Sequence, residues 1–237
     1  MSSVLAPQIR VRNAPEPARA VRMSRADRAR TQMIVSLLLD YPDATLDAKL
    51  PVLRAEAATL AGPVRDALTA FIDEAAATEP AERERRYVAT FDLKRKCCMY
   101  LTYYAAGDTR KRGGALVAFI EAYREAGWEF DAEELPDFLP AVLEFAARSG
   151  SPVADRLLSA HREGIEVLRA ALVAVGSPYG ALIEVVGMSL APIDDATRER
   201  VLRLINEGPP AETVGLGGPV DLPPFIPVGR PSEEVRG

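Results

Sequence analysis

The chain has 237 residues, 48% of them hydrophobic and 27% charged, with a net charge of −5. This length is enough for one folded domain with its own core. Two adjacent cysteines, Cys97 and Cys98, and a single histidine, His161, exclude a four-ligand zinc site, an iron–sulfur cluster and a disulfide framework. The composition leaves room for an enzyme that uses carboxylates, and the acidic balance argues against general nucleic-acid binding.

The sequence shows no recognisable targeting signal. No run of about 18 apolar residues could span a membrane, and the N-terminus lacks the apolar core of a signal peptide. Together with unpaired adjacent thiols, these features predict a cytoplasmic protein without an integral membrane segment.

The two ends differ from the middle in composition. Residues 1–22 include three prolines and show no helical period, which predicts a disordered, Arg-rich arm. Residues 209–237 include seven prolines and five glycines, which predicts an extended tail. The expected folded domain therefore covers residues 23–208, and it is more acidic than the whole chain because the arm is basic.

Between these ends, apolar residues recur at helical spacing almost throughout. In chain order, helices are expected over 24–41, 44–61, 63–77, from 80 through Phe91, over 97–106 and 109–126, over 136–149, from 151 through Leu172, from 177 onward, and over 194–208. No strand pair or hairpin signal is present. The sequence thus predicts an all-α, single-domain bundle of about nine or ten helices.

A tyrosine cluster lies in the middle of the chain. Tyr100, Tyr103 and Tyr104 are spaced to share one helix face, and Tyr87 precedes them. Such a face suits peptide binding, although core packing explains it equally well. Asp108 or Thr109 is placed to cap the following helix. The nearby Arg110 and Arg112 are expected to pair with acids elsewhere in the fold.

A second pattern, in residues 133–145, combines acids and prolines. On a helix, Glu134, Asp137 and Glu144 would lie within about 80° of one another, opposite an apolar face. This acidic stripe could dock a basic helix or could simply be solvated. Cys97 and Cys98 are interpreted as buried thiols and His161 as a packed core residue.

The stretches YVATFDL, LTYYAAGDTRKRG and ELPDFLP, within residues 87–148, resemble the NarJ-type maturation chaperones of respiratory nitrate reductase, part of a wider group that includes TorD and DmsD. Residues 31–42 support the resemblance. It implies an all-helical cytoplasmic chaperone without catalytic activity that binds the N-terminal leader of the molybdenum-containing catalytic (alpha) subunit. It also implies assistance in inserting molybdopterin guanine dinucleotide before membrane docking, with no cofactor bound stably and with cofactor-biosynthesis proteins as further partners.

Combining the resemblance with the patterns gives a hypothesis in which the tyrosine face and the acidic stripe form opposite walls of a groove for a basic leader. The expected peptide-binding residues are Tyr87, Asp92, Tyr100, Tyr103, Tyr104, Asp108, Arg110, Arg112, Glu134, Leu135, Pro136, Asp137, Pro140 and Glu144. Three alternatives stay open: a chaperone for another molybdoenzyme, a carboxylate-based enzyme, and a helical DNA-binding regulator that uses residues 197–208.

Overall fold

The computed structural model describes residues 15–107, 110–131 and 133–207. Within these ranges the chain forms α-helices and no strand, so the predicted all-α class is confirmed. The helices are α1 Arg25–Leu39, α2 Leu46–Ala58, α3 Gly62–Ala77, α4 Pro80–Tyr87, α5 Leu101–Ala106, α6 Lys111–Glu125, α7 Leu139–Ser149, α8 Pro152–Ala160, α9 Arg162–Ala174, α10 Tyr179–Ser189 and α11 Asp195–Glu207.

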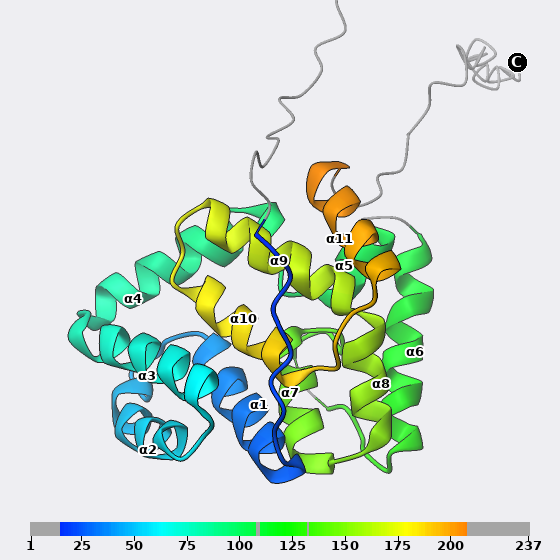
Figure 1. Ribbon diagram of the computed structural model, residues 1–237. Coiled ribbons are helices and arrows are strands. Elements are labelled where there is room, and N and C mark those ends of the chain that lie inside the picture. The colour runs from blue at the N-terminus through cyan, green and yellow to red at the C-terminus, as the bar shows by residue number, and fades with distance from the viewer. Residues whose placement is uncertain (1–14, 108–109, 132, 208–237) are drawn as a thin grey trace, which may run out of the picture.

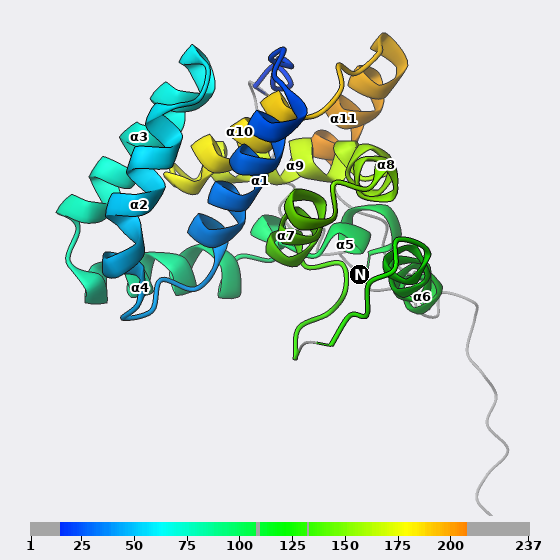
Figure 2. The ribbon, with the colours of Figure 1, turned by 90° about the horizontal axis from the view of Figure 1, so that it is seen from below.

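Helix α1 lies at the centre of the arrangement. It packs against α7 and α10, while α10 also contacts α3 and α9 (Figure 1). Seen from below, α2 and α3 lie on one side of α1, and α7, α8 and α6 lie on the other (Figure 2). One apolar core runs through these layers, with Leu39, Leu68, Leu143 and Leu182 fully buried. None of the helices in the described ranges has the length and apolar character needed to cross a membrane.

The apolar pattern did not reveal a break between two helices. The helix expected from 151 through Leu172 is two helices, α8 and α9, separated at His161, whose backbone leaves the helical region (φ −102°, ψ 13°). The His161 ring packs on Phe119, with centroids 4.9 Å apart, as expected of a core histidine. The break lets α8 pack on α6 and α7 while α9 packs on α10 and α11. Apolar spacing continues across the break, so periodicity could not reveal it.

The expected disordered arm is partly wrong. Residues 15–22 lie across α9 and α10 (Figure 1), with the Val21 amide donating to the Met188 carbonyl (2.9 Å) and Ala18 buried. Non-helical backbone held by such contacts carries no periodic signal, which explains the error. Residues 1–14 of the arm and the predicted tail at 209–237 lie outside the described residues.

Candidate peptide-binding cleft

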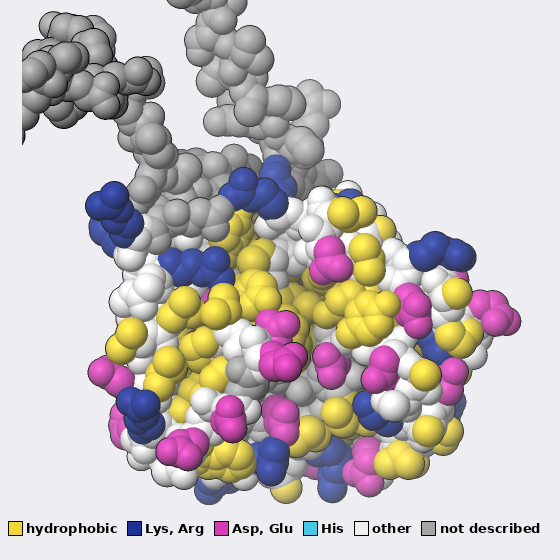
Figure 3. Space-filling view, turned by 180° about the vertical axis from the view of Figure 1, so that it is seen from behind, with side chains coloured by type: hydrophobic (Ala, Val, Ile, Leu, Met, Phe, Trp, Pro, Cys, Tyr) yellow, Lys and Arg dark blue, Asp and Glu magenta, His cyan; other side chains and the backbone are white. Residues whose placement is uncertain are grey.

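A cleft of about 460 Å³ opens between the end of α1, the end of α4 and the segments around residues 98–103 and 134–138. Hydrophobic side chains gather around a hollow on the face turned away in Figure 1, with acidic side chains beside it (Figure 3). The lining residues are Asp40, Tyr41, Tyr87, Phe91, Asp92, Arg95, Cys98, Met99, Tyr100, Tyr103, Arg112, Glu134 and Phe138.

One wall of the cleft is aromatic. The Tyr87 ring lies 5.4 Å from that of Tyr41 and 4.8 Å from that of Phe91. Tyr179, on α10, supports this wall from behind, with its ring 4.9 Å from Phe91. The Tyr87 hydroxyl donates to the Leu39 carbonyl (3.3 Å). Burial raises the pKa of Tyr87, so this wall is a largely apolar surface in which the Tyr87 hydroxyl stays protonated and bonded to the backbone.

A π-helical turn, Val88–Asp92, ends the helix that carries Tyr87. The Leu93 amide donates to the Val88 carbonyl five residues earlier (3.1 Å). A turn of this width brings residue i+5 nearer to the face of residue i than an α-helix does. Asp92 therefore lines the same cleft as Tyr87, beside Phe91.

The opposite wall comes from two segments that are distant in sequence. Tyr100 and Phe138 form an isolated antiparallel bridge, and their rings lie 5.4 Å apart. The Tyr100 hydroxyl donates to Glu134 (2.7 Å). Burial of Tyr100, and to a smaller extent this hydrogen bond, raises its pKa. The Arg112 guanidinium lies over the Tyr100 ring, 5.5 Å from its centroid.

Charges lie at the rim of the cleft. Three carboxylates, those of Asp40, Asp92 and Glu134, belong to exposed residues. Two guanidinium groups accompany them, and that of Arg112 is engaged with Tyr100 and with the Thr102 hydroxyl (3.2 Å). The rim is therefore acidic in balance, above aromatic walls, which complements a peptide with basic and apolar residues.

The predicted acidic stripe does not exist, because residues 134–138 precede α7 and are not helical. Asp137 is fully buried, and its carboxylate accepts from the Thr102 amide (3.0 Å) and hydroxyl (2.6 Å). It thus fastens the start of α5 to the opposite segment. Glu144 lies on α7, away from the cleft lining, and pairs with Arg148 (2.7 Å). Only Glu134 of the three reaches the cleft.

The prediction that Tyr100, Tyr103 and Tyr104 share one helix face is also wrong. Helix α5 begins at Leu101, so Tyr100 precedes it, although Tyr100 and Tyr103 both line the cleft. Tyr104 points into the core, where its hydroxyl donates to the Cys98 carbonyl (2.7 Å). A Cβ at Gly164 of α9 would lie 2.9 Å from the Tyr104 Cβ, so the glycine allows this close packing.

The other predicted site residues fall into three groups. Pro136 and Pro140 are buried, and their carbonyls accept from Tyr123 and Ser36. Arg110 and Leu135 are exposed and do not line the cleft. Asp108 lies outside the described residues. Six of the predicted residues line the cleft together: Tyr87, Asp92, Tyr100, Tyr103, Arg112 and Glu134.

Several lining residues were not predicted, among them Asp40, Tyr41 and Phe138. Asp40 and Tyr41 directly follow α1, within the stretch that supported the family resemblance. Cys98 lines the cleft, whereas Cys97 is buried, and neither forms a disulfide. Across the described residues, no three potential ligands from His, Cys, Asp and Glu gather into a metal site.

Comparison with known proteins assigns the family. Residues 57–183 match the family described as nitrate reductase delta subunit. The chain is 33% identical over 172 residues to a probable nitrate reductase molybdenum cofactor assembly chaperone, NarJ, of Bacillus subtilis, covering 72% of this chain and 94% of the relative.

Two further relatives match over shorter shares. The nitrate reductase-like protein NarX of Mycobacterium tuberculosis is 39% identical over 151 residues, or 64% of this chain but only 23% of the relative's length. The NarJ chaperone of Escherichia coli K12 is 34% identical over 119 residues, 49% of this chain and 50% of the relative. The chain belongs to the nitrate reductase delta subunit family.

Proposed function

We propose that this protein is a cytoplasmic chaperone that binds the N-terminal leader of the catalytic subunit of respiratory nitrate reductase. It holds that subunit for insertion of the molybdenum cofactor before membrane docking, binds no cofactor stably itself and catalyses no reaction. The names of the Bacillus subtilis and Escherichia coli relatives support the assembly role. The cleft supports the leader-binding role.

The cleft combines aromatic walls with an acidic rim, and this combination is the main support for leader binding. Tyr87, Phe91 and Phe138 offer apolar surface, and Asp92 and Glu134 lie beside it. An amphipathic leader helix would place its apolar side against the rings and its basic residues against the carboxylates. Bound in this way, the leader is shielded from other partners while the rest of the subunit stays available for cofactor insertion.

Calorimetry of the full chain with a synthetic leader peptide of the nitrate reductase catalytic subunit tests this role. We expect binding by the unaltered protein and at least about tenfold weaker binding by the Asp92→Asn/Glu134→Gln double variant, because two complementary charges are lost; tenfold corresponds to about 1.4 kcal/mol. Glu144→Gln is the matched control, since this carboxylate lies outside the cleft lining. Equal affinity in the double variant and the control would refute the assignment of the cleft.

The identity of the client has its own test. Affinity capture with the full chain from nitrate-respiring cells should retain the catalytic subunit of nitrate reductase. Capture of a different molybdoenzyme would keep the leader-binding mechanism and change the client, whereas capture of no molybdoenzyme subunit would count against the proposed role.

A further inference from the structure

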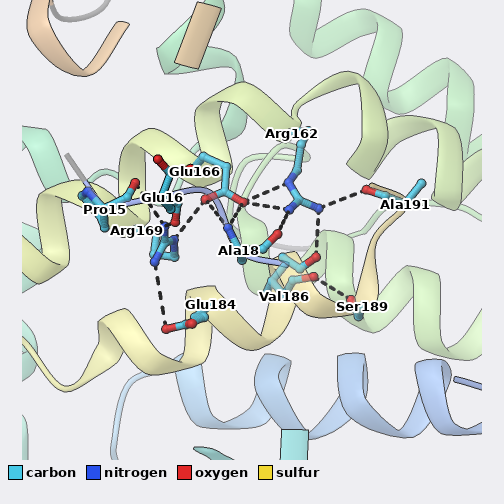
Figure 4. Close-up of polar contacts among 11 residues, drawn as sticks. Pro15, Glu16, Ala18, Arg162, Glu166, Arg169, Glu184, Val186, Ser189 and Ala191 are labelled. Carbon is cyan, nitrogen blue, oxygen red and sulfur yellow. Dashed lines mark hydrogen bonds and ion pairs between the residues drawn. The ribbon is translucent and has the colours of Figure 1, made fainter. Parts of the chain in front are cut away.

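A second surface, the α9–α10 groove, is formed by residues of both helices that contact a segment of the chain itself. Residues 15–21 cross both helices as an extended stretch (Figure 1). Three side chains of α9, Arg162, Glu166 and Arg169, point toward this segment (Figure 4). Each of the three residues is at most 4% exposed.

The three side chains form one buried network. The Arg162 Nε donates to one Glu166 oxygen (3.0 Å), and the Arg169 Nε donates to the other (3.0 Å). Two buried guanidinium groups thus share one buried carboxylate, with Glu184 3.9 Å from Arg169 at the edge. Buried charges are tolerated only when their remaining polar atoms find partners.

The backbone of the segment supplies those partners. The Ala18 amide donates to both Glu166 oxygens (3.1 and 3.2 Å), and Arg162 donates to the Ala18 carbonyl (2.9 Å). Arg169 donates to the Glu16 carbonyl. Farther along, Val21 bonds to the Met188 carbonyl of α10 (2.9 Å). All of these contacts involve backbone atoms of the segment, so they do not depend on the identity of its side chains.

Ala18 is the position at which packing limits the size of the side chain. Ala18 is buried against Gly187 of α10, and a Cβ built on Gly187 would lie 2.5 Å from the Ala18 Cβ. The Gly187 carbonyl also accepts from Arg162 (2.9 Å), which fixes the end of α10 against the network. The residue that faces Gly187 must therefore be small.

We propose that the groove between α9 and α10 is a second peptide-binding site of this protein, and that the chain's own residues 15–21 are its occupant. The site takes an extended peptide through the Arg162–Glu166–Arg169 network and requires a small residue opposite Gly187. This site shares no lining residue with the cleft, and the proposal does not depend on the leader-binding role.

The proposal can be tested by adding residues 14–22 as a separate peptide. In the full chain with Ala18→Leu, the larger side chain cannot sit on Gly187, so the tethered segment leaves the groove. A fluorescent peptide of residues 14–22 should then bind this variant, measured by anisotropy. The unaltered chain should bind it at least about tenfold more weakly, because its own tethered segment competes at an effective concentration of order millimolar. A peptide with leucine at position 18 should bind neither protein.

Gly187→Ala serves as the second variant and Gly113→Ala as its control, because a Cβ at Gly113 meets nothing within 4 Å. Combined with Ala18→Leu, Gly187→Ala should abolish peptide binding and Gly113→Ala should leave it unchanged. A folded Ala18→Leu protein that binds no peptide overturns the proposal. Should that variant not fold, amide exchange in the unaltered chain decides: protection at Ala18 and Val21 is expected, and exchange at the rates of an unstructured peptide overturns the proposal.

Discussion

The cleft and the α9–α10 groove handle charge in opposite ways. In the cleft, Asp92 and Glu134 are exposed at the rim. In the groove, Glu166 is 2% exposed, and its carboxylate depends on two arginines and a backbone amide. Exposed charges contribute little to folding and can serve binding, whereas buried ones destabilise the fold when a partner is lost. Substitutions should therefore separate the two regions, affecting binding in the first and stability in the second.

The largest effect is expected from Glu166→Ala. This change leaves two buried guanidinium groups without their carboxylate, so the free energy of unfolding should fall by about 3–5 kcal/mol. Urea denaturation followed by circular dichroism measures it. Glu163→Ala is the control on the same helix, because Glu163 forms a partly exposed pair with Arg200 and should change stability by less than about 1 kcal/mol. Similar losses in the two variants would contradict the contrast between buried and exposed charge.

Asp137→Ala should come next. It leaves the Thr102 amide and hydroxyl without their acceptor, which should lower the free energy of unfolding by about 1–3 kcal/mol. It also weakens the attachment of α5 to residues 134–138 in the same wall of the cleft. Both stability and leader affinity should therefore decrease. Glu144→Ala, from the same predicted stripe but with a side chain 47% exposed, should stay within about 0.5 kcal/mol of the unaltered protein. Calorimetry and urea denaturation of both variants check this pair.

The smallest effect concerns the two adjacent thiols. Burial raises the pKa of Cys97, which lowers its thiolate fraction at neutral pH and hence its reactivity. Cys98 is partly exposed and lines the cleft. Maleimide should therefore label Cys98 faster than Cys97. Labelling rates of the single variants Cys97→Ser and Cys98→Ser measure this difference, and a bound leader peptide should slow the labelling of Cys98. Faster reaction of Cys97 would contradict the difference in burial between the two thiols.

Most of the fold follows from local pattern. Leu46, Leu50, Leu53 and Ala57 recur at helical spacing and are buried on α2, and Ser24 accepts from the Asp27 amide at the start of α1, as expected of an N-cap. The helical break at His161 was missed because it depends on how α8 and α9 pack on different neighbours.

The candidate site divides in the same manner. Tyr87, Tyr100 and Glu134 were predicted from residue type and resemblance, and they line the cleft. Asp137 and Tyr104 were predicted to face a peptide and are instead buried. Residue type indicated that these polar groups matter, but only tertiary contacts decide whether a hydroxyl or carboxylate faces solvent or bonds to backbone inside the core.

The sequence by itself determined the helical class, the family resemblance and the shortage of cysteine and histidine, because these depend on composition, periodicity and short motifs. The tertiary structure alone decided which acids are exposed and which are buried, and it turned residues 15–22 from an expected loose arm into a segment bound by α9 and α10. The physical reason is that burial and main-chain hydrogen bonding between distant segments leave no periodic signal in the sequence.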